Sequence, residues 1–279
     1  MGKFTGVLLA SDYDHTISAM DGSIPARNVE ALRYFIREGG TFSVVSGRSI
    51  PLFRSRVPLL PINAPCLLYN GAVCYDFRSG RLLFSYTLPA DAQEILDALL
   101  AQLSDVRIEV QTKDTCYAYT ADPLRDEYLR RCGAPCVHGP APQPWVKLVV
   151  YGKFRAVEYD AADSLSSEDL AQFDRIETQM RTLCKGRANV ARSMGRIVEC
   201  WPIDCDKGAS ARRLAAMLGC KTLVGIGDAP NDLPLLDEAD FAFCPGDCDP
   251  ALRTRPYRFA APCGEGAVAG AIEALERLL

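Results

Sequence analysis

The 279-residue sequence has few histidines and no long hydrophobic run. His15 and His138 are its only histidines, and the close pair Cys244 and Cys248 has neither a histidine nor a second cysteine pair nearby in the sequence, so a structural zinc site is disfavoured. The longest apolar run near the start, residues 7–10, is too short for a membrane span or for the core of a signal peptide. We therefore expect a cytoplasmic protein that makes no membrane contact.

The chain also lacks an excess of basic residues. Its 31 Lys and Arg are outnumbered by 35 Asp and Glu, which gives a net charge of −4. Nucleic-acid binding proteins use a basic excess to neutralise phosphates, so a nucleic-acid partner is disfavoured, whereas a small phosphorylated metabolite needs only a local cluster of donors. Because there is no export signal and the chain is long enough to bury a core, the twelve cysteines are interpreted as reduced thiols.

The first part of the sequence alternates strand and helix patterns. Residues 7–11 and 41–46 are short apolar runs typical of buried parallel strands, and residues 66–69 form a third. A helix pattern begins at Pro25 and ends at a Gly-Gly pair, and a shorter one covers residues 50–57. This βαβαβ order predicts an α/β fold with a doubly wound, parallel sheet of the Rossmann-like type.

The parallel pattern is interrupted and later resumes. A hairpin pattern covers residues 72–88, and mixed helices and strands follow to about residue 196. Alternating helix and buried-strand patterns, like those of the first part of the chain, return from residue 207 to the end. We therefore predict two domains: a core made of residues 1–80 and 203–279, and an inserted α+β domain made of residues 81–202.

Polar residues follow the predicted parallel strands at the edge of the sheet where ligands bind. Asp12 and Asp14 come directly after the first strand and lie two residues apart, so they share one face and repel each other unless a cation or a proton lies between them. Mg²⁺ prefers such hard oxygen ligands, and Asp228, after a later strand, would complete the set. The residues therefore predict a magnesium site formed by Asp12, Asp14 and Asp228.

The same residues indicate phosphoryl transfer. A carboxylate such as that of Asp12 can act as a covalent nucleophile toward phosphorus. Asp14 could protonate the leaving oxygen and later deprotonate the attacking water, while Lys207 and the metal would neutralise the transferring group. Each residue alone is more often a cap, turn or surface residue, so the prediction rests on their common place at one edge of the sheet.

In order and sequence context, these segments resemble the four motifs of the haloacid dehalogenase superfamily. The place of the insertion resembles that of its Cof-type, class IIB-like phosphatases, whose inserted domain is a cap that sets substrate specificity. The resemblance implies that the core carries out phosphoryl transfer, and that the backbone carbonyl of Asp14 also faces the metal. The further residues that it assigns to phosphate binding or to support of the site are Ser46, Gly47, Arg48, Lys207, Asn231 and Asp232.

Two positions bear on the type of reaction. The family usually has Gly after the acid/base carboxylate, whereas this chain has His15, which could narrow the site or be a tolerated turn residue. The dehalogenases of the superfamily lack a carboxylate at the place of Asp14, so halide displacement is disfavoured. The expected function is hydrolysis of a small phosphorylated metabolite, in particular a sugar phosphate.

Two alternatives stay open from the sequence. A phosphosugar mutase of the same superfamily would carry the same motifs. A phospho-acceptor signalling protein would also place Asp, Ser and Lys at the edge of a parallel sheet, although its motif order differs. In the inserted domain, Trp145, Lys147 and Arg192 are candidates for substrate contacts.

Overall fold

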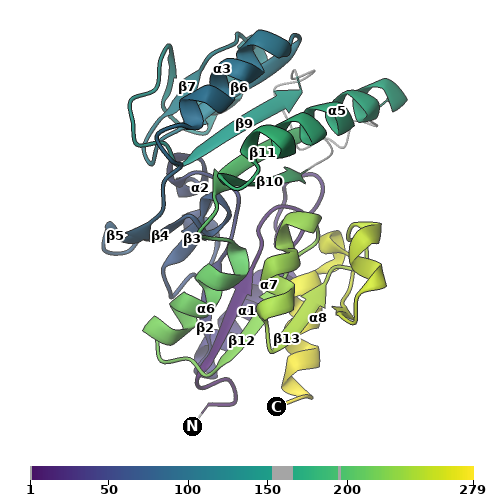
Figure 1. The fold of residues 1–279 in the computed structure, drawn as a ribbon. Helices are drawn as coiled ribbons and strands as arrows, with labels where there is room; N and C mark the ends of the chain where they lie inside the picture. The colour runs from purple at the N-terminus through teal and green to yellow at the C-terminus, as the bar shows by residue number, and fades with distance from the viewer. Residues whose placement is uncertain (1, 153–165, 194–195) are drawn as a thin grey trace. The chain divides into compact units, whose positions relative to one another are not determined.

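The computed structural model describes residues 2–152, 166–193 and 196–279 (Figure 1). These residues divide into two compact units. Unit 1 contains residues 1–47, 56–84 and 206–279, and unit 2 contains residues 48–55 and 85–205.

Unit 1 is built on a five-stranded parallel sheet in the order β14-β13-β12-β1-β2. All five residues of β1 are buried, which explains why its sequence is almost wholly apolar. The strands are β1 (Val7–Ser11), β2 (Thr41–Val44), β12 (Thr222–Ile226), β13 (Phe241–Cys244) and β14 (Arg258–Phe259).

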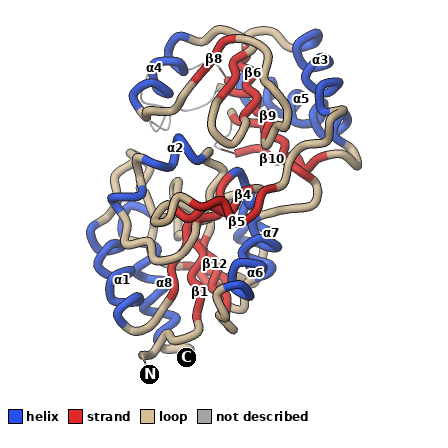
Figure 2. The backbone as a smooth tube through the Cα atoms, turned by 90° about the vertical axis from the view of Figure 1, so that its left-hand side faces the viewer, coloured by secondary structure: helices blue, strands red, loops and turns tan. Residues whose placement is uncertain are grey.

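Helices cover both faces of this sheet. In Figure 2, α1 and α8 lie on one side of β1 and β12, and α6 and α7 lie on the other. The predicted doubly wound fold is therefore confirmed. The helices are α1 (Ala26–Arg37), α6 (Lys207–Met217), α7 (Leu233–Glu238) and α8 (Ala267–Glu276).

The third predicted parallel strand differs from the expectation. β3 (Cys66–Leu68) pairs antiparallel with β4 (Val73–Asp76), and β5 (Arg81–Ser85) completes a small separate sheet. An isolated parallel bridge between Val45 and Leu67 links β3 to the segment that follows β2. The apolar run of β3 is equally suited to either partner, so its sequence could not distinguish them.

Unit 2 contains a six-stranded sheet in the order β10-β11-β9-β6-β7-β8, antiparallel except for the β7–β8 pair. Two helices, α3 (Ala92–Gln102) and α5 (Ser167–Cys184), pack with Ile108, Val110 and Val150 in one apolar core. The strands are β6 (Val106–Gln111), β7 (Cys116–Ala118), β8 (Cys136–His138), β9 (Lys147–Gly152), β10 (Ala188–Ser193) and β11 (Ile197–Pro202).

Residues that alternate with this core point to the opposite face of the sheet. There Val149, Tyr151 and Ile197 pack with side chains of α4 (Pro123–Arg131). The remaining short helix of unit 2 is α2 (Ile50–Arg54).

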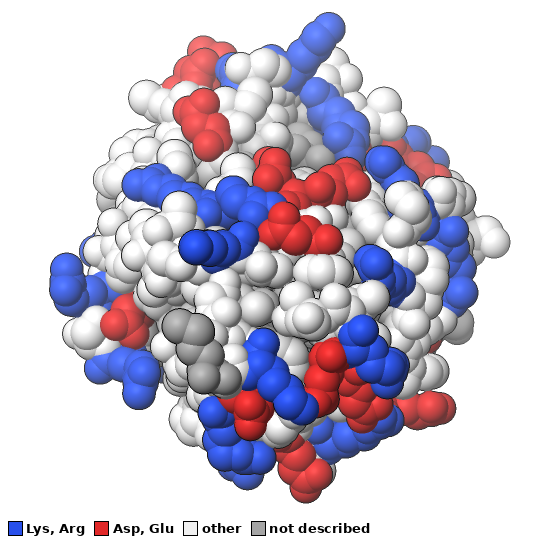
Figure 3. Space-filling model, turned by 90° about the horizontal axis from the view of Figure 1, so that it is seen from below, with Lys and Arg blue, Asp and Glu red and all other residues white. Residues whose placement is uncertain are grey.

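Two features of the described residues bear on partners and cysteine chemistry. None of the described helices is long and apolar enough to cross a bilayer. On the face drawn in Figure 3, acidic and basic side chains are interspersed. All twelve cysteines carry thiols rather than disulfides, as the sequence predicted.

Candidate active site

Asp12 lies at the carboxyl end of the central strand of unit 1. It directly follows β1, and its backbone N–H donates to the carbonyl of Ile226 at 2.8 Å, which continues the pairing of β1 with β12. Only 6% of its surface is exposed. The strand pairing therefore fixes the Asp12 backbone, and burial limits the positions open to its carboxylate.

A buried lysine joins two carboxylates at this point. Lys207, the first residue of α6, places Nζ 2.6 Å from Oδ1 of Asp12 and 2.6 Å from Oδ1 of Asp232. The start of α6 is itself fixed, because the Asp206 side chain accepts a hydrogen bond from the backbone N–H of Ala209 at 2.7 Å. Lys207 and Asp232 are almost completely buried, so their charges are compensated by these contacts.

Asp232 also holds the loop that follows β12. Its Oδ2 accepts hydrogen bonds from the backbone N–H groups of Asp228 at 3.0 Å and Ala229 at 3.1 Å. This contact requires glycine at position 227, because a Cβ on Gly227 would lie 2.4 Å from Cβ of Asp232. Asp232 is thus a positioning residue whose oxygens are already occupied by protein donors.

Asp228 is oriented by a residue that sequence analysis did not select. The hydroxyl of Thr16 donates to Oδ1 of Asp228 at 2.7 Å. Thr16 lies only four positions after Asp12, so the turn after β1 reaches the end of the neighbouring strand β12. The sequence does show a hydroxyl residue, Thr16, soon after Asp12 and Asp14. Serine and threonine are too common in turns for that spacing alone to identify a site residue.

The site holds more negative than positive charge. Burial first, and then the neighbouring carboxylates of Asp232, Asp228 and Asp14, raise the pKa of Asp12 well above its ordinary value, although the Lys207 charge opposes this shift. Burial and the charge of Asp232 raise the pKa of Asp228 to about 8. Burial alone would lower the pKa of Lys207, but the charges of Asp12 and Asp232 outweigh it and raise that pKa.

The arrangement fits a hard divalent cation. One carboxylate oxygen from each of Asp12, Asp228 and Asp232 lies within 4.8 Å of the others. Carboxylate oxygens are the ligands that Mg²⁺ prefers, and two added positive charges would offset the excess that raises these pKa values. Because Asp232 already accepts three hydrogen bonds, Asp12 and Asp228 are the better candidates for direct ligands.

Asp14 and His15 lie in the turn after Asp12. The Asp14 charge contributes to the raised pKa values of Asp12 and Asp228. His15 has a φ of 56°, in the left-handed region that glycine adopts without strain. This backbone conformation gives a physical reason for the glycine that the family usually carries here.

The other predicted phosphate-binding residues lie at the ends of neighbouring elements. Ser46 and Gly47 follow β2, and Ser46 is buried, with its N–H bonded to the Leu67 carbonyl at 2.8 Å. Asn231 lies in the short helical turn Pro230–Asp232, and its Oδ1 is buried without a hydrogen-bond partner in the described part of the chain. Arg48 falls in unit 2, where its guanidinium donates to the Tyr128 hydroxyl at 3.1 Å.

The three candidates of unit 2 differ in their surroundings. Trp145 is 1% exposed and belongs to the apolar core under α3 and α5, with its indole N–H bonded to the Ala141 carbonyl at 3.1 Å. Lys147 is buried in an ion pair with Glu199. Arg192 pairs with Asp174 at 2.5 Å. The environment of Trp145 is therefore that of a core residue.

Known proteins resemble this chain over most of its length. Residues 9–272 match the sequence model of the haloacid dehalogenase-like hydrolases. The chain is 24% identical over 256 residues to an HMP-PP phosphatase of Escherichia fergusonii, covering 88% of this chain and 86% of the relative.

Solved structures share the fold. A haloacid dehalogenase-like hydrolase from Bacteroides thetaiotaomicron has a TM-score of 0.76 at 21% identity, and the match covers 98% of this chain and 99% of that one. A sugar phosphatase of subclass IIB has a TM-score of 0.74 at 14% identity, covering 96% of this chain and 98% of that one.

Proposed function

Because the chain belongs to the haloacid dehalogenase-like hydrolase family, we propose that it is a magnesium-dependent phosphatase that forms an aspartyl-phosphate on Asp12. The observation that supports this most directly is the placement of Asp12. Its carboxylate is buried at the end of β1, bonded to Lys207 and grouped with Asp228. A carboxylate so held can face phosphorus in one orientation while its charge is balanced from the other sides.

In the first half of the reaction, an oxygen of Asp12 forms a bond to phosphorus. The bond between phosphorus and the leaving oxygen of the substrate breaks, and Asp14 donates a proton to that oxygen. The released alcohol leaves a phosphoryl group on the Asp12 carboxylate.

In the second half, water attacks the phosphoryl group and Asp14 accepts the proton of that water. The bond between phosphorus and Asp12 breaks, which releases inorganic phosphate and restores the carboxylate. One acid/base group is sufficient for both steps, because Asp14 gains in the second step the proton that it lost in the first.

The surrounding residues supply charge and orientation. Lys207 holds Asp12 in place and would offset charge on the transferring group, while Ser46, which follows β2, and the side-chain amide of Asn231, which follows β12, would donate to phosphate oxygens. Asp12 and Asp228, with the Asp14 carbonyl, would hold Mg²⁺, which when bound neutralises the phosphoryl oxygens. Asp232 and Thr16 keep Lys207 and Asp228 in their positions.

For the substrate we propose a small phosphorylated metabolite, with sugar phosphates as the preferred class. The support is that one structural relative is a sugar phosphatase and that sequence relatives are HMP-PP phosphatases. The chain covers most of each of these relatives, so a comparable cap is available to recognise the rest of the substrate.

The test is release of inorganic phosphate from a panel of sugar phosphates, nucleotides and HMP-PP. We expect turnover that disappears after dialysis against EDTA and returns with Mg²⁺. Asp12→Asn should lower the rate at least about a thousandfold. Asp21→Asn is the matched control, because Asp21 is exposed and bonds only within its own turn.

Three outcomes would overturn the proposal. Turnover that survives Asp12→Asn would exclude the nucleophile. Conversion of a phosphosugar to its isomer without free phosphate would identify a mutase instead. A phosphorylated Asp12 that persists for hours without turnover would favour the signalling alternative.

A further inference from the structure

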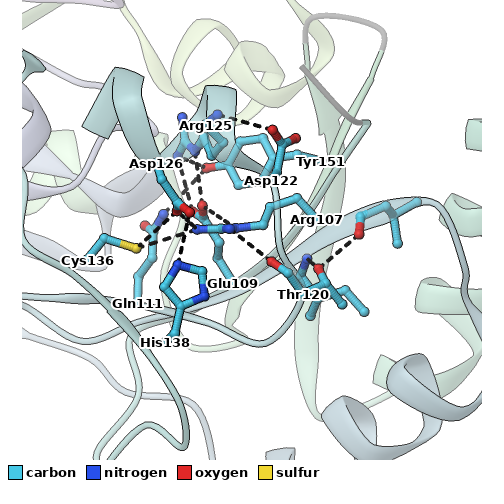
Figure 4. A network of polar contacts seen from close by, with 12 residues as sticks. Arg107, Glu109, Gln111, Thr120, Asp122, Arg125, Asp126, Cys136, His138 and Tyr151 are labelled. Carbon is cyan, nitrogen blue, oxygen red and sulfur yellow. Dashed lines mark hydrogen bonds and ion pairs between the residues drawn. The ribbon is translucent and has the colours of Figure 1, made fainter. Parts of the chain in front are cut away.

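A second group of metal-binding residue types lies in unit 2, away in sequence from the carboxylates of unit 1. Figure 4 shows Asp126, Cys136 and His138 pointing toward one another at the edge of the sheet. Asp126 comes from α4, and the other two come from β8, where residues two apart share a face. Sequence spacing did not suggest this group, because only the fold brings α4 beside β8.

The distances in this group approach those of a coordination shell. His138 Nε2 lies 2.9 Å from Oδ2 of Asp126, and Cys136 Sγ lies 3.8 Å from Oδ1 of the same carboxylate. One ligand atom from each of the three residues lies within 4.8 Å of the others. Tetrahedral zinc bonds of about 2.0–2.3 Å place ligand atoms about 3.3–3.8 Å apart, so shifts of roughly 1 Å or less would complete the shell.

The donor types select a class of cation. A thiolate and an imidazole favour zinc-like ions over Mg²⁺, which takes oxygen ligands. Asp126 adds a carboxylate, which zinc also accepts. The Asp126 and Cys136 side chains are partly buried and His138 is 53% exposed, so a cation could reach the group from solvent.

The surrounding side chains support the ligands in ways that resemble known metal sites. Arg107 is fully buried and donates to Oδ1 of Asp126 at 2.7 Å and to Sγ of Cys136 at 3.4 Å. These contacts leave Oδ2 of Asp126 directed toward His138. Outer hydrogen bonds of this kind orient ligands and tune their affinity for metal.

A second thiol lies next to the group. Cys116 on β7 pairs in register with Cys136 on β8, so the two thiols lie side by side on neighbouring strands. Cys116 is therefore the nearest candidate for a fourth ligand or for an outer partner of the Cys136 thiolate.

From this geometry we infer that Asp126, Cys136 and His138 form a binding site for a zinc-class divalent cation, distinct from the magnesium site of unit 1. The cation takes one carboxylate oxygen, one imidazole nitrogen and the Cys136 thiolate, whose proton is released to solvent. Two ligand charges balance the cation, and Arg107 stays paired with Glu109 and Asp126.

Binding would join two elements of unit 2, α4 and β8, through one cation. β8 is a three-residue strand at the edge of the sheet, and α4 contributes only one of the ligands. A bond from each element to one cation would stabilise the folded state by an amount that grows with the logarithm of the free cation concentration. The bound cation would therefore stabilise the structure of unit 2. Its binding can be tested without a measurement of phosphatase activity.

The test is titration of the full-length, metal-free and reduced protein with Co²⁺ in the presence of excess Mg²⁺. Co²⁺ bound to a thiolate gives a sulfur-to-cobalt charge-transfer band, which carboxylate ligands alone do not give. We expect that band to saturate at one equivalent and to disappear when Zn²⁺ is added.

Variants assign the band to Cys136 and His138. Cys136→Ser should remove it, and His138→Gln, which changes an exposed side chain, should weaken Co²⁺ binding roughly tenfold or more. Cys132→Ser is the matched control, since Cys132 is a partly exposed thiol of the same unit, and it should keep the band.

Three results would overturn the inference. The first is absence of the band in reduced wild-type protein whose tryptophan fluorescence is that of the folded state. The second is a band that persists in Cys136→Ser. The third is an unchanged affinity in His138→Gln, which would restrict the group to an ion-pair network.

Discussion

The substitution Glu109→Gln tests how unit 2 balances the charges buried on its sheet. Glu109 is fully buried, and Arg125 donates to both of its oxygens, from Nε at 3.0 Å and from Nη2 at 3.1 Å. Arg107 donates to the same carboxylate at 3.1 Å. Glutamine keeps the shape of the side chain but removes its charge.

The expected cost follows from the partners that remain. Arg107 keeps Asp126 and a backbone carbonyl, so its charge stays compensated. Arg125 would lose both of its bonds to a charged Glu109 and would keep its hydrogen bond to the Tyr151 hydroxyl at 2.9 Å. Removal of one partner from a buried ion pair costs about 3–5 kcal/mol. With a urea m-value of about 2 kcal/mol per M, the unfolding midpoint should fall by roughly 2 M.

Tryptophan fluorescence measures this loss selectively. The chain has two tryptophans, and both Trp145 and Trp201 are buried in unit 2, so their emission follows the unfolding of that unit. EDTA and a reductant in every sample remove contributions from bound metal. Glu127→Gln is the matched control, because Glu127 pairs with the exposed Arg130, and it should leave the midpoint nearly unchanged.

Two further measurements test whether loss of the Glu109 charge causes the lower free energy of unfolding. The double variant Glu109→Gln, Arg125→Met removes both charges, so it should be about 1–3 kcal/mol more stable than the sum of the single changes predicts. Burial alone would raise the pKa of Glu109, but the Arg125 charge and hydrogen bonds outweigh it and lower that pKa below 4.5.

A lowered pKa fixes the sign of the pH effect. The ionised form of Glu109 contributes its full stability above pH 4.5, and that contribution is lost as the pH falls through the lower pKa of the folded state. The difference between wild type and Glu109→Gln should therefore narrow in acid. A cost equal to that of the exposed control, or strictly additive single changes, would refute the reasoning.

Three other predictions concern unit 1. Gly227→Ala should lower phosphatase activity about a hundredfold, because the Cβ of the alanine would displace Asp232. The circular dichroism spectrum should stay unchanged, and full activity of the variant would contradict the close contact. His15→Gly should raise the stability measured by calorimetry by about 1 kcal/mol or less, since relief of a left-handed φ is partly offset by the greater freedom of unfolded glycine, and a clear loss of stability would argue against strain. Burial raises the pKa values of Cys66 and Cys74 to about 12, so at pH 8 only about one thiol in ten thousand is ionised. Iodoacetamide should therefore leave both cysteines unlabelled, as measured by mass spectrometry, at a time when the partly exposed thiols have reacted.

Much of the active-site region could be predicted from local sequence. The strand patterns around Asp12 and Asp228 depend on which residues are apolar over five or six positions, and that pattern is local. The family identified from these motifs is confirmed by the match over residues 9–272. The roles proposed for the individual residues remain predictions that the variants above test.

Other features depended on contacts between distant parts of the chain. The sequence contains Lys207 and Asp232 but does not show that the ammonium group of Lys207 joins Asp232 to Asp12, which lies 195 positions before the lysine. Likewise the apolar run of β3 suited a parallel or an antiparallel partner, and only tertiary pairing decided between them.

The scarce histidines show how sequence and structure can lead to different conclusions about a zinc site. From sequence, a zinc site was disfavoured because the close pair Cys244 and Cys248 has neither a histidine nor a second cysteine pair nearby. The folded structure brings His138 beside Asp126 of a preceding helix. Local sequence determines which side chains are available and the strands and helices that carry them, whereas the packing of those elements decides which side chains meet, because that packing depends on the whole buried surface at once.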